Sequence, residues 1–184
     1  MINVKNELRK QYIDIRNKIE DKEIKDNNIF NKLLSNKYIR DSKLILIYVS
    51  FNNEVDTINI IKYFLKNKLV AVPKIENNMM SFYYINSLSE LTKGKYNILE
   101  PVTNNIVNDF SSCVSITPGV CFSKNLYRIG YGKGFYDKFY SKYKEIYKIG
   151  LSYDECIIDN FKVDIYDQKL DEVITPNNIF KKNI

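Results

Sequence analysis

Apolar residues near the start of the chain recur at the spacing of a helix. They repeat every three or four positions and so share one face: Val4, Leu8, Tyr12, Ile15 and Ile19. Basic residues follow a neighbouring stripe of the same predicted helix: Lys5, Arg9 and Arg16. The stripe can be a solvated face or a surface that meets an anion, and the pattern alone does not separate the two.

Two apolar runs and the segment between them predict a pair of parallel strands. Residues 44–50 and 69–73 are apolar at nearly consecutive positions, as in strands that are buried on both faces. Between them, Asp56 or Thr57 can cap a helix whose apolar side carries Ile58, Ile61, Phe64 and Leu65. A strand, a helix and a strand at this spacing form a βαβ unit, so we expect a parallel sheet.

The rest of the chain continues in short elements of the same kinds. We expect strands over residues 81–85, 114–117, 147–152 and 172–175, a short helix over 87–93 that ends before Gly94, and a helix over about 135–143. There is no internal repeat and no low-complexity linker. Residues 1–184 therefore predict one α/β domain in three layers, with a mostly parallel central sheet flanked by helices.

Charge and composition narrow the chemistry. The net charge is +6, which suits a protein that binds anions such as nucleotides, folates or nucleic acids. The chain has no histidine, which excludes the commonest general base, Ser/His and Cys/His nucleophile pairs, and histidine metal sites. Any chemistry must then use carboxylates, Lys, Arg, Tyr, backbone N–H groups or a bound metal.

Cysteines and hydropathy bear on the compartment. Cys113, Cys121 and Cys156 are odd in number and match no metal or redox spacing, so we expect reduced thiols in the core. The longest apolar run, residues 44–49, is too short to span a bilayer, and residues 1–12 contain no signal-peptide core. We therefore expect a soluble, cytoplasmic protein that does not associate with membranes.

A glycine-rich stretch carries the clearest functional pattern. Gly130, Gly132 and Gly134 alternate just before a predicted helix, and Arg128 and Lys133 add positive charge. Glycine lets the backbone approach a ligand closely, successive N–H groups can form an anion-binding nest, and the helix dipole points at the same place. The loop suits a polyphosphate, although a plain glycine turn between a strand and a helix gives the same string.

Asp137 follows this loop in the first turn of the predicted helix. A carboxylate there can hold Mg²⁺ against the phosphates, directly or through water. An acidic residue at this position can also simply complement the helix dipole.

The residues around the glycines make the pattern specific. Residues 128–137 read R-I-G-Y-G-K-G-F-Y-D and closely resemble the signature of the 5-formyltetrahydrofolate cyclo-ligase family. Weaker matches follow in the family's order along nearly the whole chain: K-x-x-L-R at 5–9, Y-V-S-F-N-N-E-V-D-T at 48–57, V-P-K at 72–74, E-P at 100–101, P-G-V-C-F at 118–122 and D-Q-K-L-D-E-V-I-T at 167–175. Each is weak alone, but their order makes the resemblance strong.

The chain departs from the family pattern at three places beside the predicted site. The family usually has Asp where this chain has Ser123, and often has His where it has Tyr166. It often has Gly shortly before the Arg of the signature, where this chain reads K-N-L-Y at 124–127. These changes bear on substrate affinity more than on the class of reaction.

The resemblance implies a reaction that needs no histidine. The family uses ATP to activate the formyl oxygen of 5-formyltetrahydrofolate, N10 of the substrate closes the ring, and 5,10-methenyltetrahydrofolate, ADP and phosphate are released. Because the substrate supplies the nucleophile, catalysis consists mainly of positioning and charge neutralisation. The resemblance thus implies a monomeric enzyme with ATP as co-substrate and Mg²⁺ as cofactor, and with no nucleic-acid partner.

The same resemblance assigns roles to individual residues. The expected catalytic residues are Arg128, Lys133 and Asp137, and the expected Mg²⁺ ligands are Asp137 and Asp167, with Asp171 less favoured. ATP would contact Lys5, Arg9, Arg128, Ile129, Gly130, Tyr131, Gly132, Lys133, Gly134, Phe135 and Tyr136. The folate would contact Val49, Glu54, Tyr131, Gly132, Lys133, Gly134 and Phe135, with Glu54 on the pterin and one of Tyr83, Tyr84, Tyr131 or Phe135 stacked on it. Without the resemblance, Glu54 reads as a solvated loop acid.

Two other functions fit parts of the pattern. A relative that kept the fold and the ATP site but changed its folate chemistry would bind 5-formyltetrahydrofolate without turnover. A basic nucleic-acid-binding module fits the net charge, but the charge is spread along the chain and no nucleic-acid motif occurs.

Overall fold

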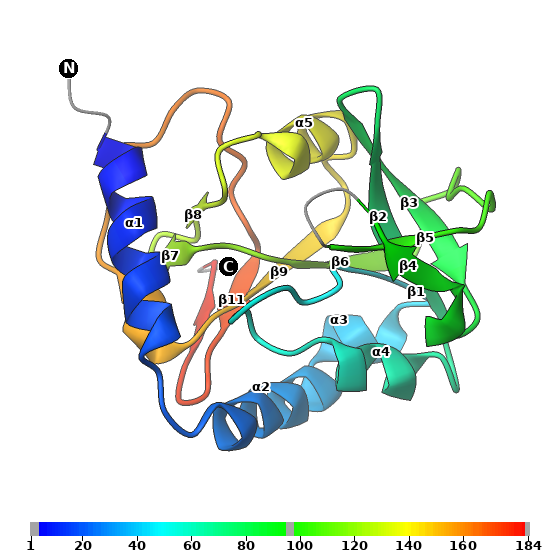
Figure 1. The fold of residues 1–184 in the computed structure, drawn as a ribbon, viewed down its shortest axis with the longest axis horizontal. Helices are drawn as coiled ribbons and strands as arrows, with labels where there is room; N and C mark the ends of the chain where they lie inside the picture. Colours follow the sequence, from blue (N-terminus) through cyan, green and yellow to red (C-terminus); the bar gives the residue numbers. More distant parts are fainter. Residues whose placement is uncertain (1–3, 95–97, 183–184) are drawn as a thin grey trace.

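A seven-stranded sheet runs through the centre of the molecule (Figure 1). The computed structural model describes residues 4–94 and 98–182, so residues 1–3 of the N-terminal stretch lie outside it. The strands stand in the order β12-β11-β9-β6-β1-β2-β3. Their bounds are β1 Leu44–Ile47, β2 Leu69–Glu76, β3 Met79–Ile85, β6 Cys113–Thr117, β9 Tyr147–Leu151, β11 Glu172–Ile174 and β12 Ile179–Lys181.

The sheet is mostly parallel, as predicted. The five inner strands pair in parallel, and only the outer strands β3 and β12 pair antiparallel to their neighbours. Helices α2, α3 and α4 cover one face, and α5 covers the other (Figure 1). Their bounds are α2 Lys22–Ser35, α3 Lys37–Asp41, α4 Ile58–Phe64 and α5 Phe135–Lys142. The expected arrangement of a central sheet between helical layers is confirmed.

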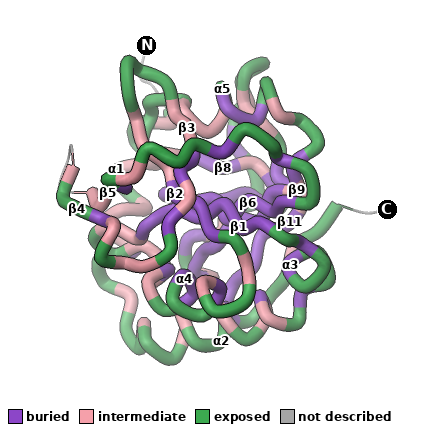
Figure 2. Tube along the Cα trace, turned by 90° about the vertical axis from the view of Figure 1, so that its right-hand side faces the viewer, coloured by how far each residue is buried: buried purple, intermediate pink, exposed green. Residues whose placement is uncertain are grey.

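Strand β1 shows why the sequence of a central strand is apolar without interruption. Ile45 and Ile47 pack into the core on the side of α2 and α4. Leu44 and Leu46 pack into the core on the side of α5. Successive side chains of a strand point to opposite faces, and here both faces are covered. Figure 2 accordingly shows β1, β6 and their neighbours as buried through the middle of the molecule.

A smaller sheet lies under α1 (Val4–Asn17) at one side of the molecule (Figure 1). Its strands stand in the order β10-β7-β8, with bounds β7 Cys121–Ser123, β8 Arg128–Ile129 and β10 Ile157–Ile158. Leu8, Tyr12 and Ile15 of α1 pack on its apolar residues, as the helical periodicity predicts. Cys113, Cys121 and Cys156 are buried and unpaired, in agreement with the expected core thiols.

The helix predicted over residues 87–93 is wrong. Leu88–Glu90 form a single 3₁₀ turn, and Leu91–Lys93 form strand β4, which pairs with β5 (Leu99–Pro101). Gly94 donates its N–H to the carbonyl of Ile98 at 2.8 Å, so it closes a hairpin instead of ending a helix. Leu91 is buried in the core, and cross-strand pairing satisfies its backbone where a segment this short cannot sustain a helix.

No helix in the described part of the chain combines the length and apolar character needed to cross a membrane.

Helices α2 and α3 and the short strands of the second sheet were not predicted. Their apolar residues lie in stretches too short to give a clear period on their own.

Candidate active site

The glycine loop joins β8 to α5 and takes its shape from two of its glycines. Gly132 and Gly134 have φ values of 94° and 67°, a region that favours glycine, and Gly134 is the N-cap of α5. A Cβ placed on Gly130 or Gly134 would meet nothing within 4 Å. Residues 131–134 are exposed. The loop therefore presents its backbone to open space, where an anion can approach N–H groups and the start of the helix.

The basic stripe of α1 faces this loop and the C-terminal segment. Arg9 donates through Nε to the carbonyl of Gly130 at 2.7 Å, and its guanidinium lies where a Cβ on Gly132 would come within 3.2 Å. Lys5 contacts the carboxylates of Asp164 and Asp167, both at 2.6 Å. The stripe is therefore a contact surface within the protein, and the predicted contact of Lys5 and Arg9 with an anion remains a prediction.

Arg128 and Asp137 form an ion pair beneath the loop. The side chain of Arg128 is only 4% exposed, and its Nη2 lies 3.0 Å from Oδ1 of Asp137. The guanidinium also lies over the rings of Tyr136 and Tyr140, 5.7 Å from each centroid. Oδ1 of Asp137 accepts a second hydrogen bond from the backbone N–H of Gln168 at 3.0 Å. The pair thus ties the start of α5 to the C-terminal segment.

Asp137 and Asp167, the carboxylates predicted to bind Mg²⁺, each keep one oxygen available. Oδ1 of Asp137 and Oδ2 of Asp167 carry the hydrogen bonds, and within the described residues the second oxygen of each carboxylate has none. The described residues contain no cluster of three or more acidic or sulfur ligands. Mg²⁺ commonly uses one or two carboxylates together with substrate phosphates and water, so two are enough. Asp171 is instead paired with Lys148 and Lys182.

Glu54 meets the glycine loop through a hydroxyl group. Tyr131 donates its hydroxyl to Oε1 of Glu54 at 3.0 Å, and Arg16 donates through Nη2 to the same hydroxyl at 2.7 Å. The backbone N–H of Phe51 donates to the other oxygen of Glu54 at 3.0 Å. Burial raises the pKa of Glu54, and the nearby charge of Arg16 opposes that rise. Glu54 is therefore a buried acid whose two oxygens both accept hydrogen bonds, not the solvated loop acid that its sequence context suggests.

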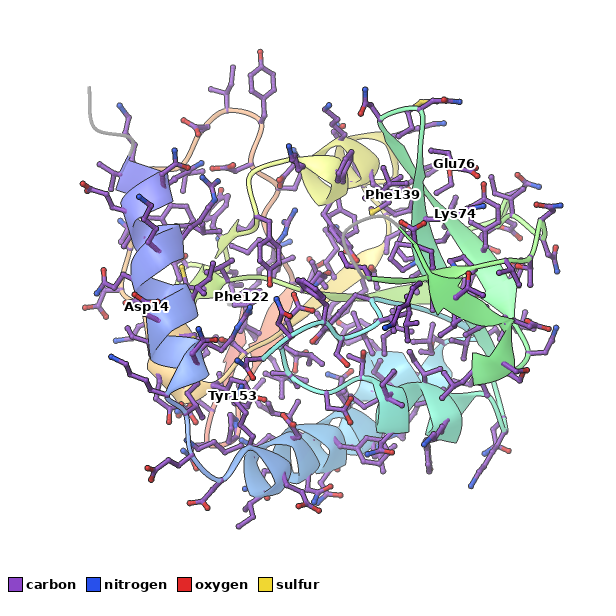
Figure 3. The ribbon with its side chains drawn as sticks, in the orientation of Figure 1. Asp14, Lys74, Glu76, Phe122, Phe139 and Tyr153 are labelled. Atoms are coloured by element: carbon purple, nitrogen blue, oxygen red, sulfur yellow. The ribbon has the colours of Figure 1, made fainter. Side chains whose placement is uncertain are left out.

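Arg16 and Tyr131 lie at the boundary between two hollows. The outer pocket has a volume of about 460 Å³ and is lined by Ile13, Arg16, Asn17, Asn52, Asn53 and Tyr131. The inner cavity has about 10 Å³, room for a water molecule at most, and is lined by residues that include Arg16, Glu54 and Tyr153. Figure 3 shows Tyr153 between α1 and α2. Only the outer pocket has the size of a small-molecule site.

The family assignment rests on comparison with known proteins. A family model described as the 5-formyltetrahydrofolate cyclo-ligase family matches residues 1–176. The chain belongs to the 5-formyltetrahydrofolate cyclo-ligase family. The resemblance that the glycine loop and its flanking motifs indicate is therefore confirmed.

Relatives and solved structures agree with this assignment. A probable 5-formyltetrahydrofolate cyclo-ligase of Schizosaccharomyces pombe is 35% identical over 64% of this chain and 66% of the relative, so the match spans about two thirds of that protein. The enzyme of Mus musculus is 30% identical over 78% of each chain. The 5,10-methenyltetrahydrofolate synthetase of Aquifex aeolicus superposes with a TM-score of 0.86 at 30% identity, covering 97% of this chain and 92% of that one. The prediction that the chain is an enzyme of this class is confirmed.

The structure brings most of the predicted residues to one side of the molecule. Lys133 is exposed and, within the described residues, its side chain forms no hydrogen bond or ion pair. Phe135 is partly exposed at the start of α5, Ile129 is buried behind the loop, and Val49 is buried after the end of β1, 4% exposed. The roles assigned to them remain predictions.

Tyr83 and Tyr84 lie elsewhere. Tyr83 donates its hydroxyl to Glu76 at 2.8 Å, and Figure 3 shows Glu76 and Lys74 on the side of the molecule opposite α1. Tyr84 packs against the core on the side of α5. Both tyrosines belong to the edge strand β3, where Tyr83 is buried and Tyr84 is half-buried. Packing within the protein therefore accounts for both aromatic side chains without a ligand.

Two departures from the family pattern have a visible structural role. Ser123 is buried and its Oγ accepts the N–H of Tyr127 at 3.2 Å, which closes the turn between β7 and β8. Leu126 lies in the same turn with a φ of 71°, a conformation that costs a branched residue energy and that glycine adopts freely. The third departure, Tyr166, is 76% exposed.

Sequence reasoning missed several contacts. Arg16 was recognised as part of the stripe but not as a partner of Tyr131, and the N–H of Gln168 was not expected to bind Asp137. The outer pocket also includes three asparagines to which no role is assigned from the sequence: Asn17, Asn52 and Asn53. The available indications are the place of Asn52 and Asn53 within the motif at 48–57 and the position of Arg16 in line with Lys5 and Arg9.

Proposed function

We propose that the protein converts 5-formyltetrahydrofolate to 5,10-methenyltetrahydrofolate with the consumption of ATP. In the first step the formyl oxygen attacks the γ-phosphorus of ATP and ADP leaves. N10 of the folate then attacks the formyl carbon and loses its proton. The carbon–oxygen bond breaks, and phosphate leaves with the former formyl oxygen. Phosphorylation turns a poor leaving group into a good one, so no protein nucleophile is needed.

The hydrogen bond between Tyr131 and Glu54 is the observation that supports this proposal most directly. Phosphoryl transfer between two substrates requires their sites to meet. Tyr131 belongs to the loop suited to phosphates, and Glu54 is the acid that the family resemblance assigns to the pterin. Their contact at 3.0 Å joins segments that lie 77 residues apart in the sequence.

The nucleotide side of the site consists of the loop and the two basic residues at the start of α1. In the proposal, backbone N–H groups of the loop and the N-terminus of α5 bind the phosphates, and Lys133 and Arg9 neutralise their charge. Lys5 lies one turn before Arg9, nearer the start of α1, in contact with Asp167. Arg128 contributes its positive charge from beneath the loop and holds Asp137 in place.

Magnesium fits between this loop and the C-terminal segment. Asp137 and Asp167 would hold the ion through the oxygens that carry no hydrogen bond. When bound, the ion would neutralise charge on the phosphates as the phosphoryl group is transferred. Lys5 and the N–H of Gln168 keep the two carboxylates oriented.

The folate side of the site must open before the pterin reaches Glu54. A carboxylate suits the N–H donors of a pterin, but the cavity behind Tyr131 holds about 10 Å³ and cannot admit a ring system. In the proposal, the pterin takes the place of the Tyr131 hydroxyl on Glu54. Tyr131 is 45% exposed, so its ring can turn outward and lie against the substrate. Phe135 follows four residues later, as the first residue of α5.

The activity test follows the near-ultraviolet absorbance of the methenyl product with 5-formyltetrahydrofolate, Mg²⁺ and ATP. Gly130→Ala is the sharpest variant, because a methyl group there meets no protein atom within 4 Å but projects into the space proposed for the phosphates. We expect an ATP-dependent rise in the wild type and a rise of KM for ATP of about tenfold or more in the variant.

Lys62→Ala is the matched control, since Lys62 is exposed on α4, which covers the face of the sheet opposite α5 (Figure 1). It should leave both kinetic constants unchanged. Folded wild-type protein that binds ATP and 5-formyltetrahydrofolate but forms no product would contradict the proposal and favour a relative with changed folate chemistry. One domain over residues 1–184, a monomeric state, a cytoplasmic location and the absence of a nucleic-acid partner remain parts of this proposal.

A further inference from the structure

The outer pocket offers hydrogen-bond donors and positive charge, and its lining contains no acidic residue. Arg16 is 5% exposed, and its Nε is a buried donor without a hydrogen-bond partner in the described part of the chain. The amide groups of Asn17, Asn52 and Asn53 complete the polar lining. A buried donor without a partner is rare, because leaving one unsatisfied costs free energy. This donor set suits a ligand that carries acceptors.

A second cation, Lys22, contacts the lining of the pocket through Asn53. Lys22, at the start of α2, donates to the carbonyl of Asn53 at 3.0 Å, and the amide of Asn53 donates to the side chain of Asn17 at 2.7 Å. Burial lowers the pKa of Lys22, and the like charge of Arg16 lowers it further, while Asp26 opposes both. Arg16 and Lys22 are thus close enough to repel, and an anion between them would be attracted by both.

The two substrates of the proposed reaction carry different chemical groups that can be compared with the lining of the outer pocket. The pterin needs an acceptor for its N–H groups, and Glu54 lines the inner cavity, not the outer pocket. The phosphates of ATP are matched by the glycine loop. The glutamate part of the folate carries two carboxylates, which suit guanidinium, ammonium and amide donors.

We propose that Arg16, Asn17, Asn53 and Lys22 form a subsite for the carboxylates of the folate glutamate. The inference rests on the proposed function and adds to it the place of the substrate's tail. Arg16 and Tyr131 connect the two regions, because Arg16 lines both hollows and Tyr131 lies in the outer lining while it contacts Glu54. A folate with its pterin on Glu54 then extends past Tyr131 into the outer pocket.

The test compares 5-formyltetrahydrofolate with 5-formyltetrahydropteroate, which lacks the glutamate. We expect the wild type to use the folate with a kcat/KM at least about tenfold higher, since hydrogen bonds to charged groups are strong. Lys22→Met and Asn53→Ala should each lower kcat/KM for the folate about fivefold and for the pteroate less than about twofold. Both residues lie at the surface, so the variants avoid the loss of folding that Arg16→Ala could cause.

Lys25→Met is the matched control, because Lys25 lies one turn further along α2 and pairs with Glu155 away from the pocket. It should discriminate between the two substrates as the wild type does. An equal loss for both substrates in Lys22→Met and Asn53→Ala would overturn the subsite. A rise of KM for ATP in these variants, with the ratio of the two substrates unchanged, would assign the pocket to the nucleotide instead.

Binding of p-aminobenzoyl-glutamate, followed by NMR, separates this inference from the proposed function. Binding that Lys22→Met weakens, in a protein that forms no methenyl product, would uphold the subsite and remove the reaction. Product formation without discrimination between folate and pteroate would uphold the reaction and remove the subsite. Neither product nor binding would overturn both.

Discussion

The two cores beside the central sheet and the region between α1 and the glycine loop are stabilised in different ways. The cores consist of apolar side chains that alternate between the faces of the sheet. The region under α1 instead buries charged groups, among them Arg16 and Arg128, and joins distant segments by directed hydrogen bonds. Arg9 and Gly130, for example, are 121 positions apart. Changes in the cores should therefore alter stability, whereas changes beside the loop should mainly alter activity.

Phe82→Ala should have the largest effect on stability. Phe82 is completely buried in β3 and packs against Phe139 of α5 with ring centroids 5.0 Å apart. Removing the ring leaves a cavity, and we expect a loss of about 3–5 kcal/mol in the free energy of unfolding. Urea denaturation measures this loss. Met79→Ala in the same strand, where Met79 is 69% exposed, should change the free energy by less than about 0.5 kcal/mol.

Asp137→Asn should separate activity from stability. Asparagine keeps an oxygen acceptor for Arg128 and for the N–H of Gln168, so the fold should persist, but the charge that would hold Mg²⁺ is lost. We expect kcat/KM to fall by about 100-fold or more, equivalent to about 2.7 kcal/mol. Steady-state kinetics over a range of Mg²⁺ concentrations measures it.

Asp171→Asn is the control for that prediction, since Asp171 pairs with Lys148 and Lys182. Its kcat/KM and its dependence on Mg²⁺ should match those of the wild type. Full activity in Asp137→Asn would show that Asp137 acts only through the hydrogen bonds that asparagine keeps, to Arg128 and to the N–H of Gln168. The difference between the two regions would then not extend to activity at this position.

Gly132→Ala and Gly130→Ala test how far the loop itself is a strained element. Gly132 has a φ of 94°, and a methyl group there would come within 3.2 Å of the Arg9 guanidinium. We expect Gly132→Ala to lower the free energy of unfolding by about 1–2 kcal/mol. Gly130 lacks a positive φ and has open space beside it, so its variant should change stability by less than about 0.5 kcal/mol. Equal losses in thermal unfolding would indicate that the backbone conformation is not what requires glycine.

The same contrast explains what the sequence could predict. Strands β1, β2 and β6 were recognisable because a strand buried on both faces is apolar at every position, which is a local property. Segment 87–93 was misassigned because its structure depends on pairing with Leu99–Pro101 across a turn, and a three-residue strand has no pattern of its own. Helix α2 has its core-packed apolar residues, Ile29, Phe30, Leu33 and Leu34, at helical spacing but only in its second half, so the period extends over less than about two turns.

The candidate site was predictable to the extent that its parts are local. The glycine loop could be found because its conformation requires particular residues at particular positions, and the motifs around it carry the family resemblance. The pairing of Arg128 with Asp137, and of Tyr131 with Glu54, depends on how distant segments pack. No spacing in the sequence expresses that packing, and the motif that contains Asn52 and Asn53 does not reveal that they meet Asn17 and Arg16 at one pocket.

Glu54→Gln should have the smallest effect on the free energy of unfolding. The direction in which that effect changes with pH shows whether burial dominates the pKa of Glu54. Because burial raises the pKa of Glu54 above its ordinary value of 4.5, the folded state favours the protonated acid. The stabilising contribution is then complete below pH 4.5 and is lost as the pH rises through the folded-state pKa. Wild-type stability should therefore decline relative to Glu54→Gln over that interval, by about 1.4 kcal/mol for each unit by which the folded-state pKa is raised.

Urea denaturation of both proteins between pH 4 and pH 7 measures the difference, and Tyr131→Phe sharpens it. The Tyr131 hydroxyl donates to Glu54 and lowers its pKa, so removing that hydroxyl should steepen the decline. A difference that grows in favour of the wild type as the pH rises would mean that Arg16 and the N–H of Phe51 outweigh burial. In that case Glu54 would be held as a carboxylate ready for the N–H donors of a pterin, and displacing Tyr131 would require a stronger competing donor.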